Sequence, residues 1–466
     1  MSLPASVEQL CAWTGGSLLR GRPDQTFSGT KIDSREVGAR ELFVAIVGPN
    51  HDAHQFLGNV LLAGAAGALV QSDRIDDTLP RSDGFLVHVE DTTRALADLA
   101  RGHRQSFEGP LIGITGSNGK TTTKELCAGI LAGVGPTLST RGNLNNNFGV
   151  PLTLLRREES DIHAVIEMGM NHRGEIADLA AIAAPTIGVL TNVGSAHIEF
   201  LGSRDTIAQE KGDLLAAIPA DGTAIVGRDD PLAFAQSERT QARVLSFGRD
   251  PRADLRASSV RFLAEGAYRF DLETPFGRGE IRVPGLSETI VENALAAAGG
   301  ALAAGATLEA VATGLASHPG VPGRMQPRAF PNDVLVIDDS YNANPQSMRS
   351  ALETLARLAS SNRRFAVLGP MGELGEAADE AHLDVGRLAG SLEFDGLFLL
   401  GPSADLIAKG ARESGLVESR IHIEENHASL AHTLQTQLSK GDRVLVKGSR
   451  AARMERVIEL LEEGNT

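Results

Sequence analysis

The segment GITGSNGKTTTKE, residues 113–125, combines residue types and a spacing that suit the binding of a phosphate chain. An apolar stretch typical of a strand precedes it, and a pattern typical of a helix follows. Backbone N–H groups in such a turn, together with the helix N-terminus, attract anions. Lys120 would reach the terminal phosphates, and Thr121 would place a hydroxyl on Mg²⁺. The segment therefore predicts a site for ATP or a related nucleotide.

The spacing of this loop departs from the pattern G-x-x-x-x-G-K-[ST], because Ile114 occupies the first glycine position. A glycine-rich turn with an incidental lysine is the alternative interpretation, and the flanking strand and helix argue against it. The residues of the loop expected to bind ATP are Gly116, Ser117, Asn118, Gly119, Lys120, Thr121 and Thr122.

Polar residues also stand where two further strands are expected to end. VIEMG presents Glu167, and LTNVGSAHIE presents Asn192 and His197. Ligands gather at the carboxyl ends of parallel strands, so these side chains should face the phosphate loop. A carboxylate and a neutral imidazole can both bind a divalent metal, although Mg²⁺ prefers oxygen. Considered alone, Glu167 could equally be a solvated carboxylate, His197 an exposed histidine and Lys211 a solvated helical lysine.

The last third of the chain has its own polar cluster. VIDDSYNANPQSM places Asp339, Tyr341, Asn342 and Asn344 after an apolar strand. Asn and Asp beside Pro suit a plain turn, although a tyrosine and two amides also suit a ligand. VKGSR ends another predicted strand with two donors for an anion, Lys447 and Arg450.

Short apolar strands alternate with helical stretches along most of the 466 residues, which predicts βαβ units and mostly parallel sheets. The length suggests three domains. We expect an α/β fold with a small N-terminal α/β domain over 1–108, a central P-loop ATP-binding domain over 109–319 and a C-terminal Rossmann-like domain over 320–466.

Two segments depart from this alternation. Residues 260–283 alternate in polarity around a Gly-bearing turn, which predicts an antiparallel hairpin. Residues 318–333, HPGVPGRMQPRAFPND, are rich in Pro and Gly without a clear period, which predicts a linker.

Composition limits the partners. The formal net charge of −15 argues against nucleic acid or an anionic membrane as a general partner, but it allows small anions in a locally positive pocket. Two cysteines, Cys11 and Cys127, fit a reducing cytosol, and no secretory signal or membrane span is evident. We expect a cytoplasmic protein, and a monomer.

Several segments occur together in a specific order: GSNGKTTTKE, EMGMNHRGEI, TNVGSAHIE, EKGDLL, DDSYNANPQS, GPMGELG and KGSR. Together they resemble the Mur ligases of peptidoglycan synthesis, over nearly the whole chain. IDSREVGARELFVAIVG looks like the start of that family's UDP-binding domain. YNANP and NLNNNFGVP favour the branch that adds D-alanyl-D-alanine over the sister branch that adds the third amino acid, where a DNPR-type motif would be expected.

The resemblance implies ATP and two Mg²⁺ ions as cofactors, with a CO₂-derived carbamate on Lys211. It implies that Thr121, Glu167, His197 and the modified lysine hold metal, and that Lys120, Lys211 and His197 serve catalysis. The expected contacts of the ATP base and sugar are Asn293, Arg324, Asp339 and Tyr341. The expected contacts of the other substrates are Ser34, Asn143, Asn146, Asn342, Asn344, Lys447 and Arg450.

The reaction implied by the resemblance activates the terminal carboxylate of UDP-MurNAc-tripeptide as an acyl phosphate. The amine of D-Ala-D-Ala then displaces phosphate to give UDP-MurNAc-pentapeptide, ADP and phosphate. A folylpolyglutamate-synthase-like ligase is an alternative within the enzymes, and the DSR and YNANP segments argue against it. A non-catalytic nucleotide-binding switch is an alternative of another class, and the EMG and SAHIE clusters argue against it.

Overall fold

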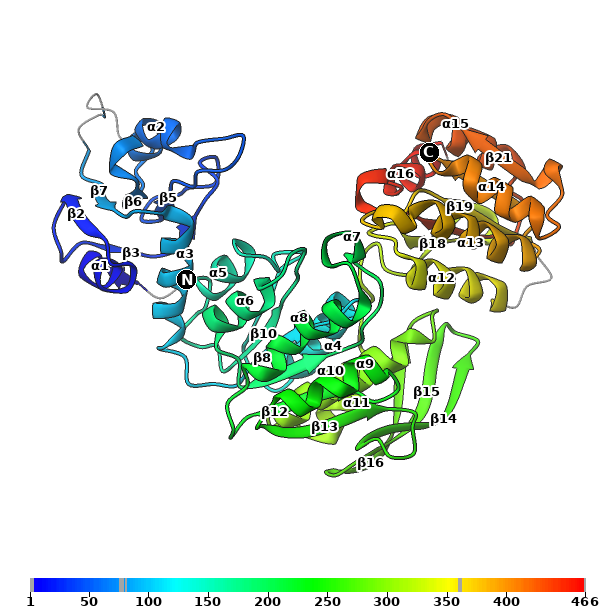
Figure 1. Ribbon diagram of the computed structural model, residues 1–466, viewed down its shortest axis with the longest axis horizontal. Helices are drawn as coiled ribbons and strands as arrows, with labels where there is room; N and C mark the ends of the chain where they lie inside the picture. Colours follow the sequence, from blue (N-terminus) through cyan, green and yellow to red (C-terminus); the bar gives the residue numbers. More distant parts are fainter. Residues whose placement is uncertain (1–3, 75–78, 80–81, 359–362, 465–466) are drawn as a thin grey trace.

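The computed structural model describes residues 4–74, 79, 82–358 and 363–464. The chain forms three α/β parts in sequence order, each around its own sheet, and Figure 1 shows them as blue, cyan-to-green and yellow-to-red lobes. The fold class predicted from the sequence is confirmed. In the described residues no helix is both long and apolar enough to cross a membrane. Cys11 and Cys127 are both free thiols.

The N-terminal part contains a five-stranded sheet in the order β2-β7-β6-β5-β4, in which only β2 runs antiparallel to its neighbour. Its apolar strands β5, β6 and β7 are buried between α1 and α3 on one face and α2 on the other. Its elements are β1 (Ala5–Ser6), α1 (Val7–Thr14), β2 (Ser17–Arg20), β3 (Thr26–Phe27), β4 (Thr30–Lys31), β5 (Leu42–Val44), α2 (Leu57–Leu62), β6 (Gly67–Val70), β7 (Phe85–His88) and α3 (Thr92–Arg104).

The central part contains a nine-stranded sheet in the order β16-β15-β14-β13-β12-β11-β8-β10-β9. Helices α4, α10 and α11 cover one face, while α5, α6 and α8 cover the other. Its parallel strands are β8 (Leu111–Thr115), β9 (Thr137–Ser139), β10 (His163–Glu167), β11 (Ile187–Leu190), β12 (Thr223–Gly227) and β13 (Arg243–Gly248). Its helices are α4 (Lys120–Ala132), α5 (Gly149–Leu154), α6 (Glu175–Ala183), α7 (Ile198–Leu201), α8 (Arg204–Ala216), α9 (Pro231–Ala235), α10 (Thr289–Ala303) and α11 (Leu308–Ala316).

The predicted hairpin is one half of a longer antiparallel meander. β14 (Leu255–Leu263), β15 (Ala267–Thr274) and β16 (Gly277–Pro284) pair in succession and extend the sheet at its edge. Alternate residues of β15, such as Tyr268 and Phe270, are buried while Arg269 is exposed, which is the period of a strand with one covered face.

The C-terminal part contains a six-stranded sheet in the order β17-β18-β22-β19-β20-β21, with only β17 antiparallel. Helices α12, α13 and α14 cover one face, and α15 and α16 cover the other. Its strands are β17 (Gln326–Phe330), β18 (Val334–Asp339), β19 (Arg364–Leu368), β20 (Gly396–Leu400), β21 (Ile421–Glu424) and β22 (Arg443–Lys447). Its helices are α12 (Pro345–Arg357), α13 (Ala378–Ser391), α14 (Ala404–Glu413), α15 (His427–Gln437) and α16 (Glu455–Glu463).

The prediction that residues 318–333 form a linker is wrong for the second half of the segment. Gln326–Phe330 form β17, paired along its length with β18. Pro327 lacks an N–H, yet it is tolerated because β17 lies at the edge of the sheet and needs hydrogen bonds on one side only. The segment that joins the central and C-terminal parts is therefore shorter than the composition suggested.

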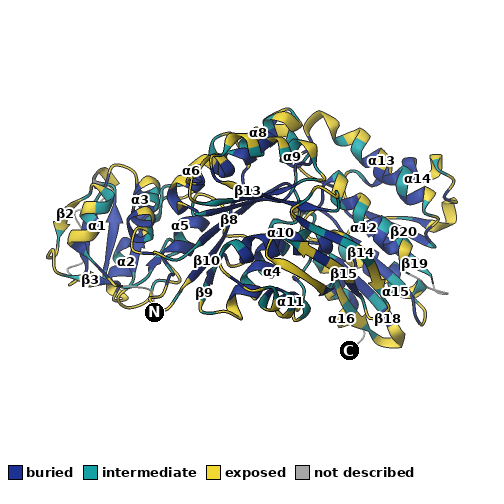
Figure 2. Cartoon of the chain, turned by 90° about the horizontal axis from the view of Figure 1, so that it is seen from below, coloured by how far each residue is buried: buried dark blue, intermediate teal, exposed yellow. Residues whose placement is uncertain are grey.

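The N-terminal and central parts share one buried apolar core. This core runs from Val7 through Leu99 in α3 to Leu179 in α6, and Figure 2 shows buried residues continuing between these elements. Arg104 adds hydrogen bonds from its guanidinium to the carbonyls of Ala183 and Ala184, at 2.7 and 2.9 Å. Helix α3 is thus packed into both parts.

Candidate active site

The phosphate loop lies between β8 and α4, as its sequence predicts. Gly119 precedes α4 with φ = 80°, in the left-handed region that favours glycine. A Cβ on Gly116 would lie 1.8 Å from Thr191 Oγ1, and one on Gly119 would lie 2.1 Å from Asn293 Oδ1. Thr191 and Asn293 therefore approach the loop so closely that only glycine fits at these two positions.

Strand β11 holds the loop in place from the neighbouring side. Ser117 N–H donates to Asn192 O and Asn118 N–H donates to Asn192 Oδ1, both at 2.9 Å. Thr191 Oγ1 donates to Asn118 O at 2.7 Å. Because β11 pairs in parallel with β8, the polar residues that follow it reach the loop directly.

Lys120 begins α4 and folds back over the loop. Its Nζ donates to Gly116 O at 2.7 Å and approaches Ser117 O at 3.4 Å. Burial lowers the pKa of Lys120, the charge of Glu167 opposes this change, and Arg324 adds to it. A partly buried lysine whose ammonium lies beside loop carbonyls at the cleft suits electrostatic recognition of a phosphate oxygen.

Glu167 ends β10 beside the loop, in register with Ile114 of β8. Its Oε1 accepts hydrogen bonds from Thr121 Oγ1 at 3.2 Å and from Asn145 Nδ2 at 2.8 Å. Its Oε2 is buried without a partner among the described residues. A buried carboxylate oxygen without a partner, next to a hydroxyl, is suited to a cation.

Asn145 was missed by the sequence reasoning, which singled out Asn143 and Asn146 in the same asparagine-rich run. Both of those residues line the cleft, but the Oδ1 of Asn146 accepts from Gly149 N–H, at the first residue of α5, at 2.9 Å. The run NLNNN carries no signal for which amide turns toward Glu167. The carboxylate predicted at the end of this strand suggests that some asparagine of the run contacts it, but not which one.

Lys211 lies in α8 and is 1% exposed. Burial lowers the pKa of Lys211 well below its ordinary value, and the nearby charge of Lys120 lowers it further. Burial therefore favours the uncharged form of this amine. The side chain does not line the cleft directly, although the charge of Lys120 acts on it.

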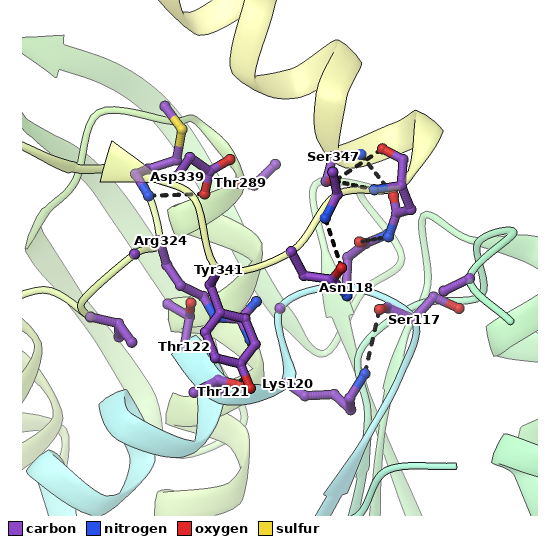
Figure 3. Close-up of a pocket in the computed structure, with 18 of the residues that line it drawn as sticks. Ser117, Asn118, Lys120, Thr121, Thr122, Thr289, Arg324, Asp339, Tyr341 and Ser347 are labelled. Atoms are coloured by element: carbon purple, nitrogen blue, oxygen red, sulfur yellow. Dashed lines mark hydrogen bonds between the residues drawn. The ribbon is translucent and has the colours of Figure 1, made fainter. Parts of the chain in front are cut away.

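The C-terminal part reaches the loop through Arg324. Its Nη2 donates to Thr121 Oγ1 at 3.1 Å, and its guanidinium lies 4.2 Å from the centre of the Tyr341 ring (Figure 3). Asp339 ends β18 nearby and accepts from Met325 N–H at 3.0 Å. A flat ring stacked with an arginine offers a surface for a nucleotide base.

Two further polar contacts cross from the C-terminal part to the central part. Asn344 Nδ2 donates to Asn118 Oδ1 at 2.7 Å, which joins the start of α12 to the phosphate loop. Ser195 Oγ donates to Gln346 Oε1 at 2.9 Å. Asn344 also caps α12, because its Oδ1 accepts from Ser347 N–H at 2.9 Å.

His197 also faces the C-terminal part across the cleft. Its Nδ1 lies 2.6 Å from Glu373 Oε2, although the ring is not aligned for a straight hydrogen bond. Within the described residues no group of three His, Cys, Asp or Glu side chains forms a ready metal site. Mg²⁺ does not require one, since it commonly keeps several waters and substrate oxygens.

Lys447 and Arg450 each form an ion pair with a carboxylate. Lys447 is 2% exposed, and its Nζ donates to Asp339 Oδ2 at 2.6 Å and to Asn342 O at 2.8 Å. The pairing follows from register, since Asp339 and Lys447 are directly opposite on β18 and β22. Arg450 pairs with Glu455 at 2.8 Å at the cleft wall.

These side chains line one cleft between the central and C-terminal parts, with a volume of about 1820 Å³. This exceeds the usual size of a site for one small ligand, so the cleft has room for a nucleotide and a second substrate. Of the predicted site residues, Ser34, Gly116 and Lys211 do not line it. Those that do are Ser117, Asn118, Gly119, Lys120, Thr121, Thr122, Asn143, Asn146, Glu167, His197, Asn293, Arg324, Asp339, Tyr341, Asn342, Asn344, Lys447 and Arg450.

Comparison with known sequences shows which family has this arrangement. Residues 114–301 match the Mur ligase middle domain, and residues 323–450 match the Mur ligase glutamate ligase domain. The chain is also 37% identical to the UDP-N-acetylmuramoyl-tripeptide–D-alanyl-D-alanine ligase of Escherichia coli, over 95% of each protein. The chain belongs to the Mur ligase family. The Mycobacterium tuberculosis ligase of the same name is 36% identical over 99% of this Mur ligase and 98% of its own length.

Solved structures agree with this family membership. MurF from Acinetobacter baumannii superposes on this Mur ligase with a TM-score of 0.90 at 33% identity, covering 99% of both chains. MurF from Thermotoga maritima, solved in complex with ADP, has a TM-score of 0.82 at 31% identity and covers 94% of this chain and 97% of its own. A folylpolyglutamate synthase from Mycobacterium tuberculosis shares the fold at 20% identity, with a TM-score of 0.64 over 79% of this chain and 94% of its own.

Proposed function

We propose that this chain is an ATP-dependent ligase that joins D-alanyl-D-alanine to UDP-N-acetylmuramoyl-tripeptide. The products are UDP-MurNAc-pentapeptide, ADP and phosphate, and the pathway served is the synthesis of peptidoglycan precursors. Support comes from relatives of that name that are 36–37% identical over at least 95% of the chain. The observation that carries the proposal is the cleft in which the phosphate loop meets Arg324, Tyr341 and Asn344.

The chemistry follows from the weakness of a carboxylate as an acyl donor. Transfer of the γ-phosphoryl group from ATP to the tripeptide carboxylate forms an acyl phosphate, and the dipeptide amine then displaces phosphate. Such a transfer depends on placement and charge neutralisation more than on covalent help. Lys120 and the N–H groups of the loop bind the phosphates, Arg324 and Tyr341 hold the base and sugar, and Asn293 and Asp339 complete that side.

A divalent cation fits the residues beside the loop. Glu167 Oε2 is a buried oxygen without a partner in the described residues, and Thr121 contributes a hydroxyl next to this carboxylate. His197 lines the same cleft. Mg²⁺ held by these three residues would reduce the repulsion between the two anions that must meet. A second ion remains part of the proposal, as the family resemblance implies.

Lys211 fits the chemistry of a carbamate. A carbamate forms only on a neutral amine, and the burial of Lys211 favours that form. The modification would turn a buried amine into an anionic oxygen ligand, whose charge would attract the ammonium of Lys120. Lys211 is therefore proposed as a positioning group.

The remaining assignments stay proposals of the same kind. We assign residues 1–108 to the UDP substrate, with Ser34 among its contacts, and residues 109–319 to ATP. Residues 320–466 are assigned to the ATP base and ribose and to the incoming dipeptide. Asn143, Asn146, Asn342 and Arg450 are proposed to contact substrates at the cleft. Lys447 acts there through Asp339 and the Asn342 carbonyl, which already engage its ammonium. A cytoplasmic monomer remains the expected form.

Mass spectrometry of the product tests the proposed reaction. The enzyme is incubated with ATP, Mg²⁺, D-Ala-D-Ala and UDP-MurNAc-tripeptide ending in either lysine or diaminopimelate. We expect the mass of the pentapeptide product from one tripeptide or both, with phosphate release that depends on both acceptors. Phosphate release with a folate and glutamate instead, or release independent of any acceptor, would refute the assignment.

A further inference from the structure

Residues 369–377 of the C-terminal part form a segment that is hydrogen-bonded to the rest of that part at three points. Gly369 N–H donates to Lys447 O, and Ser449 N–H donates to Pro370 O, both at 2.8 Å. Met371 N–H donates at 2.9 Å to Nε2 of His382, a buried side chain. The loop therefore moves with the C-terminal sheet as one body.

The tip of this loop reaches the central part. Glu373 adopts φ = 59° and Gly375 adopts φ = 53°, so the backbone turns sharply at both residues. Glu199 N–H, in α7, donates to Glu373 O at 3.4 Å. A Cβ on Gly375 would lie 3.3 Å from Glu199 Cγ, which shows how closely the loop approaches α7.

The side chain of Glu373 extends from this tip to His197. Its Oε2 lies 2.6 Å from His197 Nδ1. The histidine side chain is only 16% exposed, and its φ of 66° directs the chain into α7 beside the cleft. Nδ1 makes no aligned hydrogen bond with any residue the structure describes, and Glu373 Oε2 is the charged group beside it. An incidental surface ion pair would be expected between two exposed side chains, not at a largely buried ring in the cleft wall.

We propose that Glu373 is a positioning residue that fixes the ring of His197 when the C-terminal part is seated on the central part. A neutral imidazole has one N–H and one lone pair. A proton kept on Nδ1 by the carboxylate leaves Nε2 with the lone pair, available to a cation in the cleft. Carboxylates orient ligating histidines in this way at many metal sites. The two ends of this contact belong to different sheets, so closure of the cleft would itself complete the site.

The inference rests on the proposed function, in which His197 faces a divalent cation. It adds a residue from the far side of the cleft, and it explains why GPMGELG carries an acid at a strained backbone position. Because Glu373 is carried on a rigid loop, its distance from His197 reports the position of the whole C-terminal part.

Three variants of the full chain test the role. Glu373→Ala removes the contact, Glu373→Gln keeps an oxygen acceptor without the charge, and Glu376→Ala removes an exposed acid from the same loop as the control. Binding of Mn²⁺ is followed by electron paramagnetic resonance at saturating ADP. We expect Glu373→Ala to weaken binding about 10–100-fold, the usual effect of removing such a partner. Glu373→Gln should recover most of the loss, and Glu376→Ala should match the wild type.

Two further readouts separate positioning from a structural effect. In protein labelled with ¹⁵N-histidine, the His197 ring, assigned through a His197→Gln variant, should be protonated on Nδ1 in the wild type and lose that preference in Glu373→Ala. In turnover, kcat should fall in Glu373→Ala while KM for ATP changes less than about twofold. Wild-type Mn²⁺ affinity in Glu373→Ala, or equal losses in the Ala and Gln variants, would overturn the inference. Absence of pentapeptide product with the wild type would instead refute the proposed function and leave the Mn²⁺ result standing.

Discussion

The two junctions of the central part are built from different groups. Toward the N-terminal part, α3 packs on α5 and α6 within a continuous apolar core. Toward the C-terminal part, the contacts across the cleft are mostly between polar side chains, such as Asn118 with Asn344 and Ser195 with Gln346. Exposing buried apolar surface to water is costly in free energy, whereas polar groups that separate can form hydrogen bonds with water instead at little cost. The first junction is suited to permanence and the second to opening and closing.

The same difference separates stability from chemistry. The apolar junction contains the chain's single tryptophan, Trp13, packed against α3. The polar junction contains the phosphate loop and the cleft. Substitutions at the first should therefore change unfolding and leave turnover intact, and substitutions at the second should do the reverse.

Lys120→Ala should give the largest effect, at the polar junction. Loss of the loop ammonium removes a charge that stabilises the transferred phosphoryl group, and we expect turnover to fall about 10³-fold or more. Phosphate release measures turnover, and fluorescence of Trp13 during urea unfolding should be unchanged. Lys409→Ala, at an exposed lysine of α14, is the control. Activity close to that of the wild type in Lys120→Ala would remove the phosphate loop from the mechanism.

Leu99→Ala should give the next largest effect, at the apolar junction. Leu99 is fully buried in the shared core, and its truncation should lower the free energy of unfolding by about 3 kcal/mol. Urea unfolding followed by Trp13 fluorescence measures the loss, with kcat of the folded enzyme unchanged. Leu62→Ala, at a side chain 69% exposed in α2, should cost under about 0.5 kcal/mol. A large fall in kcat with unchanged unfolding would contradict the division between the junctions.

Asn344→Asp tests one cross-cleft hydrogen bond without disturbing the helix. Aspartate is as good an N-cap as asparagine, so α12 keeps its cap, but the Nδ2 donor to Asn118 is lost. We expect kcat/KM for ATP to fall about 10-fold, close to the value of one hydrogen bond. Asn426→Asp makes the same change at the similarly capped helix α15 and should have no effect. Equal kinetics in both variants would show that the contact does not hold the cleft closed.

The smallest expected effect is a pH dependence of the free energy of unfolding, caused by a histidine at the apolar junction. His103 in α3 is buried, and neither ring nitrogen has a partner in the part of the chain that the structure describes. Burial, aided by Arg157, lowers the pKa of His103 to about 4. In the unfolded chain the imidazole of His103 titrates near pH 6.5. Below that pH the unfolded chain therefore binds a proton that the folded protein does not bind. The free energy of unfolding consequently falls as the pH drops toward 4. His103 should contribute about 1 kcal/mol of the loss between pH 7 and 5.5.

Urea unfolding at the two pH values measures this term. His103→Gln should reduce the pH dependence by that amount, and His432→Gln, at an exposed histidine of α15, should leave it unchanged. An identical pH dependence in wild type and His103→Gln would show that the ring is protonated in the folded state.

The comparison also explains what the sequence could predict. The phosphate loop, Glu167 and the residues after β11 were predictable together, because parallel strands bring their carboxyl ends to one edge. The partners that cross the cleft were less accessible. Arg324 meets Thr121 across 203 positions, and Glu373 meets His197 only because two separate sheets face each other. No local period encodes that orientation.

One error and two omissions of detail have similar physical causes. β17 was taken for linker because Pro and Gly obscure an edge strand that pairs on one side only. Lys447 was interpreted as a free anion donor, whereas its partner Asp339 becomes visible only once β18 and β22 are known to be neighbours. The choice of Asn143 and Asn146 over Asn145 reflects a turn whose side-chain directions depend on packing.

The shortness of the segment between α11 and β17 has a consequence for the speed of the reaction cycle. Only residues 317–325 join the two parts, and nine residues span at most about 30 Å even when fully extended. A detached C-terminal part would thus remain near its docking surface at an effective concentration on the order of millimolar. Even weak cross-cleft contacts would then re-form after each release of product, and dilution of the enzyme would not slow that step.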